Sequence, residues 1–159
     1  MLYRAPVDSL VADLKYHHQL HFGPLLAGIL AELAQQAESG MQLLLPVPMR
    51  AQRLRERGFN QAAELARCLS LRLEIPWAAD RLFRIRGGDQ QQALKRGERR
   101  RNVSGAFACN GVLPARVALI DDVMTTGATA EEASRMLKAA GAERVEVWTV
   151  ARTGREREF

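Results

Sequence analysis

VALIDDVMTTGAT, at residues 117–129, is the segment from which the architecture of the chain is most readily predicted. Its first four residues are apolar, which is typical of a strand buried on both faces. After residue 129 apolar residues recur at the helical period, and a second apolar run follows at Val145–Val150. The order strand, loop, helix, strand predicts a βαβ unit, so the central sheet is expected to be at least partly parallel. We therefore expect an α/β protein.

The polar residues after the first strand suit a phosphorylated sugar. We expect a loop from Asp122 to Ala128 at the carboxyl end of the strand, where open α/β sheets bind ligands. Asp121 and Asp122 can accept hydrogen bonds from ribose hydroxyls and help to hold Mg²⁺, mainly through water. A helix is expected to start near Thr129 or Ala130 and to direct its positive end at a phosphate. The backbone N–H groups and hydroxyls expected around that phosphate belong to Thr125, Thr126, Gly127, Ala128 and Thr129.

The aspartate pair also fits three other roles. A Walker B element would need a GxxxxGK[ST] loop, which the sequence lacks. A receiver-type acidic pocket would need a phospho-acceptor strand after the pair, and the sequence offers none. Simple capping of a strand end accounts for either carboxylate alone, but not for both acids followed by the hydroxyl-rich turn. The combination favours a site for a 5-phosphorylated ribose.

The length of the chain, without an internal repeat or a linker, predicts a single domain over residues 1–159. Two amphipathic helices are expected within 6–39, and the core is expected over 42–152. Leu43–Leu45 predicts a short strand, which a proline-stiffened turn ends.

The middle of the chain predicts a helix, a strand and a loop. Apolar residues over 59–71 follow the helical period, and Asn60 is suited to cap that helix. Leu82–Ile85 alternates as a strand does. Residues 86–101 are rich in Gly, Gln and Arg, so we expect a mobile loop or an exposed polar segment there.

Composition and charge narrow the classes of partner. The formal net charge is +5 and the pI about 9.9, which favours anionic partners such as phosphates or nucleic acid. No apolar run approaches the roughly 20 residues of a membrane span, and no secretory signal opens the chain. We expect a cytoplasmic protein without membrane insertion. Cys68 and Cys109 cannot form a disulfide framework or a zinc site alone, and we expect both to be small, at least half-buried residues.

The chain resembles a known family of proteins. Residues 117–129 resemble the phosphoribosyl pyrophosphate signature of type I phosphoribosyltransferases, position by position. A second resemblance, which covers nearly the whole chain, is to the ComF/GntX family of competence-related phosphoribosyltransferase-like proteins. It rests on LLLPVPMRAQRLRERGFNQ at 43–61, Gln91-xx-Leu94, Glu98-Arg99-xx-Asn102, Gly105-Ala106-Phe107 and Leu14-Lys15-Tyr16.

The sequence departs from that family in two places. Members commonly begin with a four-cysteine zinc-binding segment, which this sequence does not contain, so it is either a short form or lacks its N-terminal part. Gly88 stands where a hydroxyl residue is expected in the polar loop.

The resemblance implies a type I phosphoribosyltransferase-like fold, with a mainly parallel central sheet flanked by helices. It also implies that the turn of Val47, Pro48, Met49 and Arg50 binds pyrophosphate, although from the residues alone a rigid surface turn with solvated arginines explains it equally well. A lid would close over the site in such a fold. Arg57 and Gln61 are further candidates for ligand contact. Candidates for the lid are Arg84, Arg86, Gln91 and Arg99, although these polar side chains could also be simply solvated.

Two functional hypotheses follow. In the first, an enzyme binds Mg²⁺–phosphoribosyl pyrophosphate and displaces pyrophosphate with a nitrogen nucleophile, such as a nucleobase-like acceptor, in a setting of competence or DNA utilisation. In the second, the protein is a non-catalytic module that senses phosphoribosyl pyrophosphate or binds DNA, with competence-machinery proteins as further partners. The sequence contains no residue that stands out as a base for the nucleophile.

Overall fold

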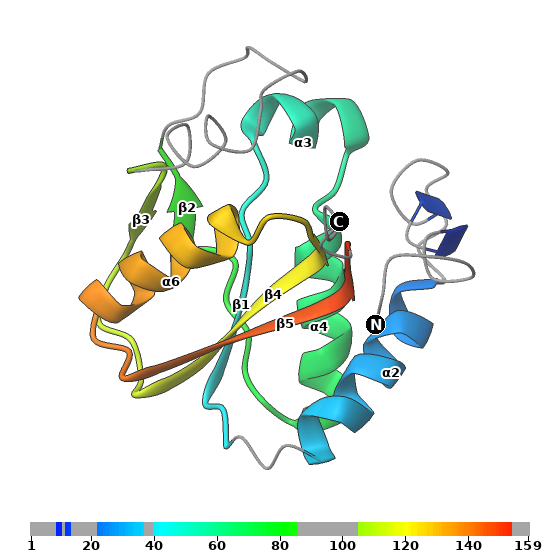
Figure 1. Cartoon of the computed structure of the whole chain (residues 1–159), viewed down its shortest axis with the longest axis horizontal. Coiled ribbons are helices and arrows are strands. Elements are labelled where there is room, and N and C mark those ends of the chain that lie inside the picture. Colours follow the sequence, from blue (N-terminus) through cyan, green and yellow to red (C-terminus); the bar gives the residue numbers. More distant parts are fainter. Residues whose placement is uncertain (1–8, 11, 14–21, 37–39, 86–104, 154–159) are drawn as a thin grey trace, which may run out of the picture.

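The computed structural model describes residues 9–10, 12–13, 22–36, 40–85 and 105–153 of the 159-residue chain (Figure 1). The elements, in chain order, are α2 (Phe22–Gln36), β1 (Leu43–Pro46), α3 (Ala51–Arg57), α4 (Gln61–Leu73), β2 (Leu82–Arg84), β3 (Phe107–Cys109), β4 (Arg116–Met124), α6 (Ala128–Ala139) and β5 (Arg144–Arg152). The second expected N-terminal helix is α2. The first lies largely outside the described residues, and the polar segment expected at 86–101 lies entirely outside them.

The central sheet is parallel and has the order β1-β4-β5. Pro46 lies opposite Ile120, and Asp121 lies opposite Thr149. An antiparallel hairpin of β2 and β3 forms a separate sheet, in which Arg84 lies opposite Phe107. Because the central strands are parallel, their carboxyl ends meet at one edge, which lies toward the upper right in Figure 1.

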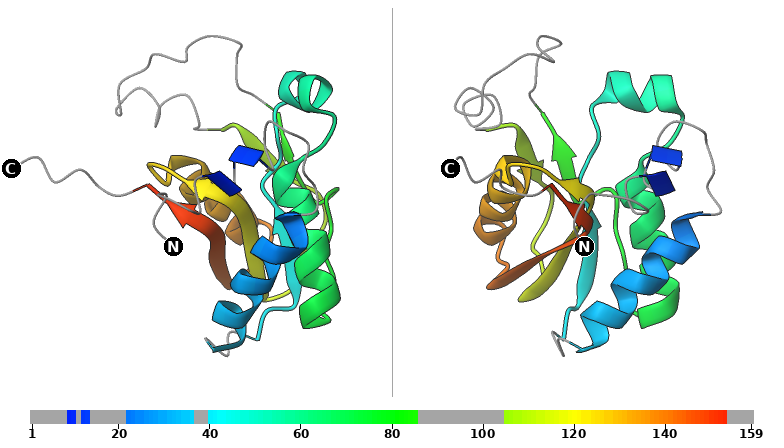
Figure 2. Two further views of the ribbon diagram at one scale, coloured as in Figure 1. Left: turned by 90° about the vertical axis from the view of Figure 1, so that its right-hand side faces the viewer. Right: turned by 45° about the vertical axis from the view of Figure 1, so that its right-hand side comes forward.

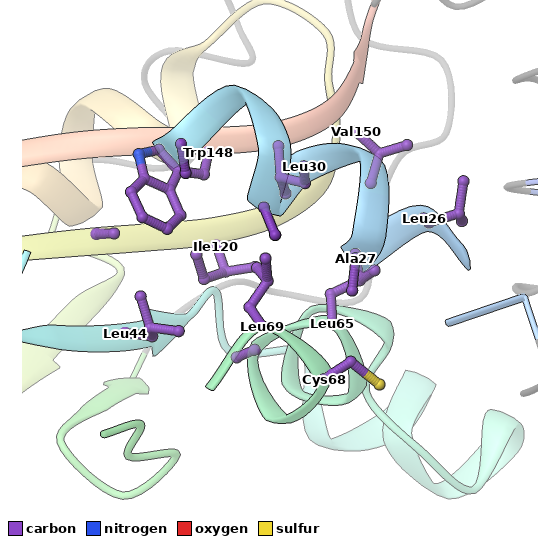
Figure 3. Close-up of a cluster of buried hydrophobic side chains, with 14 of the residues drawn as sticks. Leu26, Ala27, Leu30, Leu44, Leu65, Cys68, Leu69, Ile120, Trp148 and Val150 are labelled. Carbon is purple, nitrogen blue, oxygen red and sulfur yellow. The ribbon is translucent and has the colours of Figure 1, made fainter. Parts of the chain in front are cut away.

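Helices cover both faces of the central sheet, as the two views of Figure 2 show. On one face, α2 and α4 bury a first cluster of side chains between themselves and the strands (Figure 3). On the other face, α6 and the β2–β3 hairpin bury a second cluster, which includes Leu45, Leu82, Phe107, Leu119 and Leu137. The first cluster includes Leu26, Leu30, Leu44, Leu65, Leu69, Ile120, Trp148 and Val150. Burial on both faces explains the continuous apolar runs of β1 and β4.

Two cysteines take the places expected of small apolar residues. Cys68 is buried in the first cluster, and Cys109 is half-buried at the end of β3. Burial raises the pKa of both thiols. Both are therefore mainly protonated at neutral pH.

The expectation of a loop from Asp122 to Ala128 is wrong in its first half. Strand β4 continues through both aspartates to Met124, because β5 is long enough to pair with it as far as Arg152. The loop is thus only residues 125–127, and α6 begins at Ala128, slightly earlier than expected.

Two helices also differ from expectation. The helix expected over 59–71 begins at Gln61, because Asn60 caps it with an extended backbone. The sequence pattern did not predict α3, whose residues are all outside the core. A helix with no buried residue has no apolar period, which is the signal that sequence reasoning uses.

Within the described ranges, none of the helices has the length and apolarity required to cross a membrane.

Candidate phosphate and ribose site

The two aspartates lie at the carboxyl end of the central strand β4. The carboxylate Oδ1 of Asp121 accepts a hydrogen bond from the backbone N–H of Asp122, with 2.9 Å between N and O. The Oδ1 of Asp122 accepts one from the N–H of Val123 at 2.6 Å. On β5, the hydroxyl of Thr149 donates to the carbonyl oxygen of Asp122 at 3.2 Å. These contacts hold both carboxylates beside the backbone at the edge of the sheet.

The strand is irregular at these aspartates. Ile120 belongs to the first cluster and Val123 packs against it, although the two residues are three positions apart. Regular alternation would place them on opposite faces of the sheet. The register of β4 with β5 is nevertheless the same on both sides of Asp122, because Asp121 pairs with Thr149 and Val123 pairs with Ala151.

A short turn joins β4 to α6. Its last residue, Gly127, has a φ of 80° and forms the N-cap of the helix. The Thr126 hydroxyl lies 3.4 Å from the N–H of Ala128, which donates to it. The positive end of α6 thus opens at residues 125–129, where Thr125 is exposed and Thr129 is half-buried. This arrangement can receive a phosphate.

The turn after β1 is held between the sheet and α4. The N–H of Val47 donates to the carbonyl of Ile120, the residue before Asp121, with 2.8 Å between N and O. The Asn60 side chain donates to the carbonyl of Val47 at 3.0 Å and accepts from the N–H of Ala62 at 3.0 Å. The sequence predicted the second of these bonds as a helix cap, but not the first. Pro48, Met49 and Arg50 continue the turn and are half-buried.

Three arginines from different elements lie near one another beside that turn. The guanidinium of Arg84, on β2, lies over the ring of Phe107, 5.1 Å from its centroid. Burial lowers the pKa of Arg84, and the positive charges of Arg50 and Arg53 lower it further. Clustered guanidinium groups attract phosphate groups and can bind them bidentately.

The other predicted contact residues have varied positions. Gln61 is the first residue of α4 and only 1% exposed, and its amide nitrogen has no hydrogen-bond partner among the described residues. Arg57 is half-buried at the end of α3. Arg86, Gln91 and Arg99 lie outside the described residues. Ligand contact by any of these side chains stays a prediction.

The side chains at the site determine how a metal ion could bind there. The described residues contain no group of three or more His, Cys, Asp or Glu side chains able to hold one. Mg²⁺ usually takes one or two carboxylates and completes its shell with water and substrate phosphates. Asp121 and Asp122 fit that mode of binding, in which the phosphorylated ligand brings the ion with it.

Two residues beside the site escaped sequence reasoning. Thr149 lies opposite Asp121 only because of the β4–β5 register. Glu132, on α6, accepts a hydrogen bond from the distant Gly105. Neither residue belongs to a local motif, so no signal along the chain could identify them.

Solved structures define the class of this fold. Glutamine phosphoribosylpyrophosphate amidotransferase from Bacillus subtilis superposes with a TM-score of 0.55 at 20% identity, over 81% of this chain and 26% of that one. A purine phosphoribosyltransferase from Pyrococcus horikoshii gives 0.50 at 18% identity, over 82% and 73%. The fold is that of the type I phosphoribosyltransferases.

Curated relatives then define the family. Competence protein F of Haemophilus influenzae is 35% identical over 94% of this chain and 69% of its own length. DNA utilization protein YhgH of Salmonella typhimurium is 33% identical over 95% and 69%. This chain therefore belongs to the competence protein F family. Competence protein ComFC of Bacillus subtilis matches at 36% identity over 62% of this chain and 39% of its own. No family model matches the sequence.

Proposed function

We propose that this protein binds Mg²⁺–phosphoribosyl pyrophosphate and transfers its phosphoribosyl group to a nitrogen nucleophile, with loss of pyrophosphate. One observation carries the proposal: three groups suited to three parts of that ligand lie at one edge of the sheet. Asp121 and Asp122 suit the ribose hydroxyls, residues 125–129 suit the 5-phosphate, and the turn 47–50 suits the pyrophosphate. The Val47–Ile120 hydrogen bond joins the turn directly to the residue before Asp121.

The chemistry requires charge stabilisation more than proton transfer. As the bond from C1 to pyrophosphate breaks, the ribose gains oxocarbenium character and the leaving group gains negative charge. The carboxylates of Asp121 and Asp122 would hold the sugar in place, and the guanidinium groups of Arg50 and Arg84 would stabilise the departing pyrophosphate. Magnesium would neutralise charge on the pyrophosphate when bound beside the two aspartates.

A binding experiment tests this proposal. Titration calorimetry with Mg²⁺–phosphoribosyl pyrophosphate should show one site in the native chain. In the double variant Asp121→Asn/Asp122→Asn, binding should weaken at least about tenfold, since a hydrogen bond to a charged group contributes about 1.5–3 kcal/mol. Asp80→Asn, at an exposed aspartate between α4 and β2, is the matched control and should bind like the native chain. Absence of binding by the native chain would refute the proposal.

Catalysis is tested separately from binding. The native chain should release pyrophosphate when a suitable nucleobase-like acceptor is added. If it binds the ligand but releases none with any of a panel of acceptors, the protein is a sensor of phosphoribosyl pyrophosphate and the transferase assignment is wrong.

A second candidate function is DNA binding, which the helix α3 favours. None of its residues is buried, and it carries Arg53, Arg55 and Arg57 near the carboxyl edge of the sheet (Figure 1). Such a helix can contact phosphates of a nucleic-acid backbone. Two relatives carry names that refer to DNA utilisation or competence, which agrees with this context. Salt-sensitive DNA binding that survives Asp121→Asn/Asp122→Asn would place DNA on a surface separate from the ribose site.

A further inference from the structure

Helix α6 begins directly after residues 125–127, which we call the phosphate turn, and it also holds the end of the β2–β3 hairpin. Glu132 lies one turn into α6, four residues after Ala128. Its Oε1 accepts a hydrogen bond from the backbone N–H of Gly105, with 2.6 Å between N and O. This bond crosses between elements that are distant in the sequence, and the Glu132 side chain is only 11% exposed.

Arg135 fixes the orientation of that carboxylate. Its Nη2 donates to the Oε1 of Glu132 at 2.7 Å, and its Nε donates to the Oε2 at 3.0 Å. This two-pronged contact lowers the pKa of Glu132, so the side chain is ionised at neutral pH. A charged acceptor makes a stronger hydrogen bond to a backbone amide than a neutral one does.

Gly105 is placed to transmit this contact to the hairpin. It has a φ of 67°, which favours glycine, and it directly precedes Ala106, whose carbonyl accepts a hydrogen bond from the N–H of Ile85 at 2.8 Å. The next residue, Phe107, lies opposite Arg84, and the guanidinium of Arg84 lies over the Phe107 ring. The bond from Gly105 to Glu132 therefore lies two residues from the partner of Arg84.

We propose that Glu132 is a positioning residue, which holds Arg84 at a set place relative to the phosphate turn by clamping Gly105 to α6. The inference rests on the proposed function, because it assigns Arg84 to the pyrophosphate group. The predicted effect on binding differs between the two phosphate groups of the ligand. Loss of the clamp should weaken binding of pyrophosphate, while residues 125–129 should still bind a 5-phosphate.

Two probes separate these effects in calorimetric titrations of the full chain: Mg²⁺–pyrophosphate and ribose 5-phosphate. In Glu132→Ala, affinity for Mg²⁺–pyrophosphate should fall about tenfold, because Arg84 would no longer be placed to make its charge-assisted hydrogen bond to the pyrophosphate. Affinity for ribose 5-phosphate should stay within about twofold, since the phosphate turn itself is unchanged. Glu132→Gln keeps an acceptor for Gly105 and should recover most of the affinity. An equal loss for both probes, or no loss for either, would overturn the assignment.

Hydrogen–deuterium exchange tests the clamp without a ligand. In Glu132→Ala, amides of residues 82–85 and 105–109 should exchange faster, whereas amides of β4 should not. Unchanged exchange in the hairpin would disprove the clamp even if pyrophosphate binding fell. If the native chain binds neither probe but the hairpin alone exchanges faster in the variant, the clamp holds and the proposed function is what fails.

Discussion

Asn60 joins the turn 47–50 to helix α4. Its carboxamide uses both ends: the nitrogen donates to the carbonyl of Val47, and the oxygen caps the N–H of Ala62. A serine or aspartate would cap the helix equally well but has no amide donor for the turn. The side chain therefore stabilises a helix and the shape of a neighbouring turn together.

Replacing Asn60 tests this double role. Asn60→Ala should lower the free energy of unfolding by about 1–2 kcal/mol, the usual loss for a helix N-cap, with some further loss from the bond to Val47. Asn60→Asp keeps the cap and removes only the donor, so its loss should be smaller. Urea denaturation of both variants measures the difference. Equal stability of the alanine variant and the native chain would show that neither bond matters.

The aspartates of β4 show what a local pattern can and cannot predict at single residues. The pair was identified from its position after an apolar run, and the structure places it at the carboxyl edge of the sheet. The proximity of Thr149 to the pair depends on β5, which is a separate strand. Chain-local patterns do not contain that pairing.

At the scale of elements, the conformation of Gly127 decides how β4 passes into α6. A φ of 80° is costly for residues with a side chain, because the Cβ crowds the backbone. A Cβ built at Gly127 would meet the Sδ of Met124 at 3.8 Å, an ordinary contact. The cost of a substitution there would therefore come from the backbone and not from a steric clash.

Gly127→Ala should destabilise the protein by about 1–2 kcal/mol and also weaken binding of ribose 5-phosphate. Gly58→Ala is a matched control, since Gly58 also has a φ of 80° and open space around its Cβ position, but ends α3 instead. It should cost similar stability and leave ribose 5-phosphate binding unchanged. Thermal unfolding and calorimetry provide the two readouts. If both variants bound the sugar phosphate alike, the turn 125–127 would not be the phosphate site.

The helix α3 shows why some elements escape prediction. Its sequence, AQRLRER, has no apolar stripe, and the helix buries no residue. It ends in a left-handed Gly58, whose N–H bonds to the carbonyl of Leu54 at 2.8 Å. The helix begins after Arg50 of the turn 47–50 and ends at this C-terminal cap. Neither feature produces an apolar period in the sequence.

At the scale of the whole molecule, stability rests on the two clusters that sandwich the central sheet. The first cluster joins α2 and α4 to β1, β4 and β5, and the second joins α6 and the hairpin to the same strands. Strands β1 and β4 contribute side chains to both clusters. Disruption of either cluster should therefore disrupt the other, and the protein should unfold in one cooperative transition.

Two leucines of α4 test this arrangement. Leu69 is fully buried in the first cluster, whereas Leu71 is 72% exposed. Leu69→Ala should lower the free energy of unfolding by about 2–5 kcal/mol through lost burial and the cavity left behind. Leu71→Ala, which has the same effect on helix propensity, should change it by no more than about 0.5 kcal/mol. Comparable losses in urea denaturation would contradict the packing of α4 against the sheet.

Local patterns in the sequence are enough to predict the α/β class of the fold and the turn that leads from β4 into a helix. Continuous apolar runs, a helical period and a hydroxyl-rich turn are local properties, so the βαβ unit around residues 117–150 could be predicted from them. Three further features depend on residues far apart along the chain: the approach of the turn 47–50 to Asp121, the cluster of Arg50, Arg53 and Arg84, and the Glu132–Gly105 bond. These features arise only in the folded chain, because strand register and packing between layers bring the groups together.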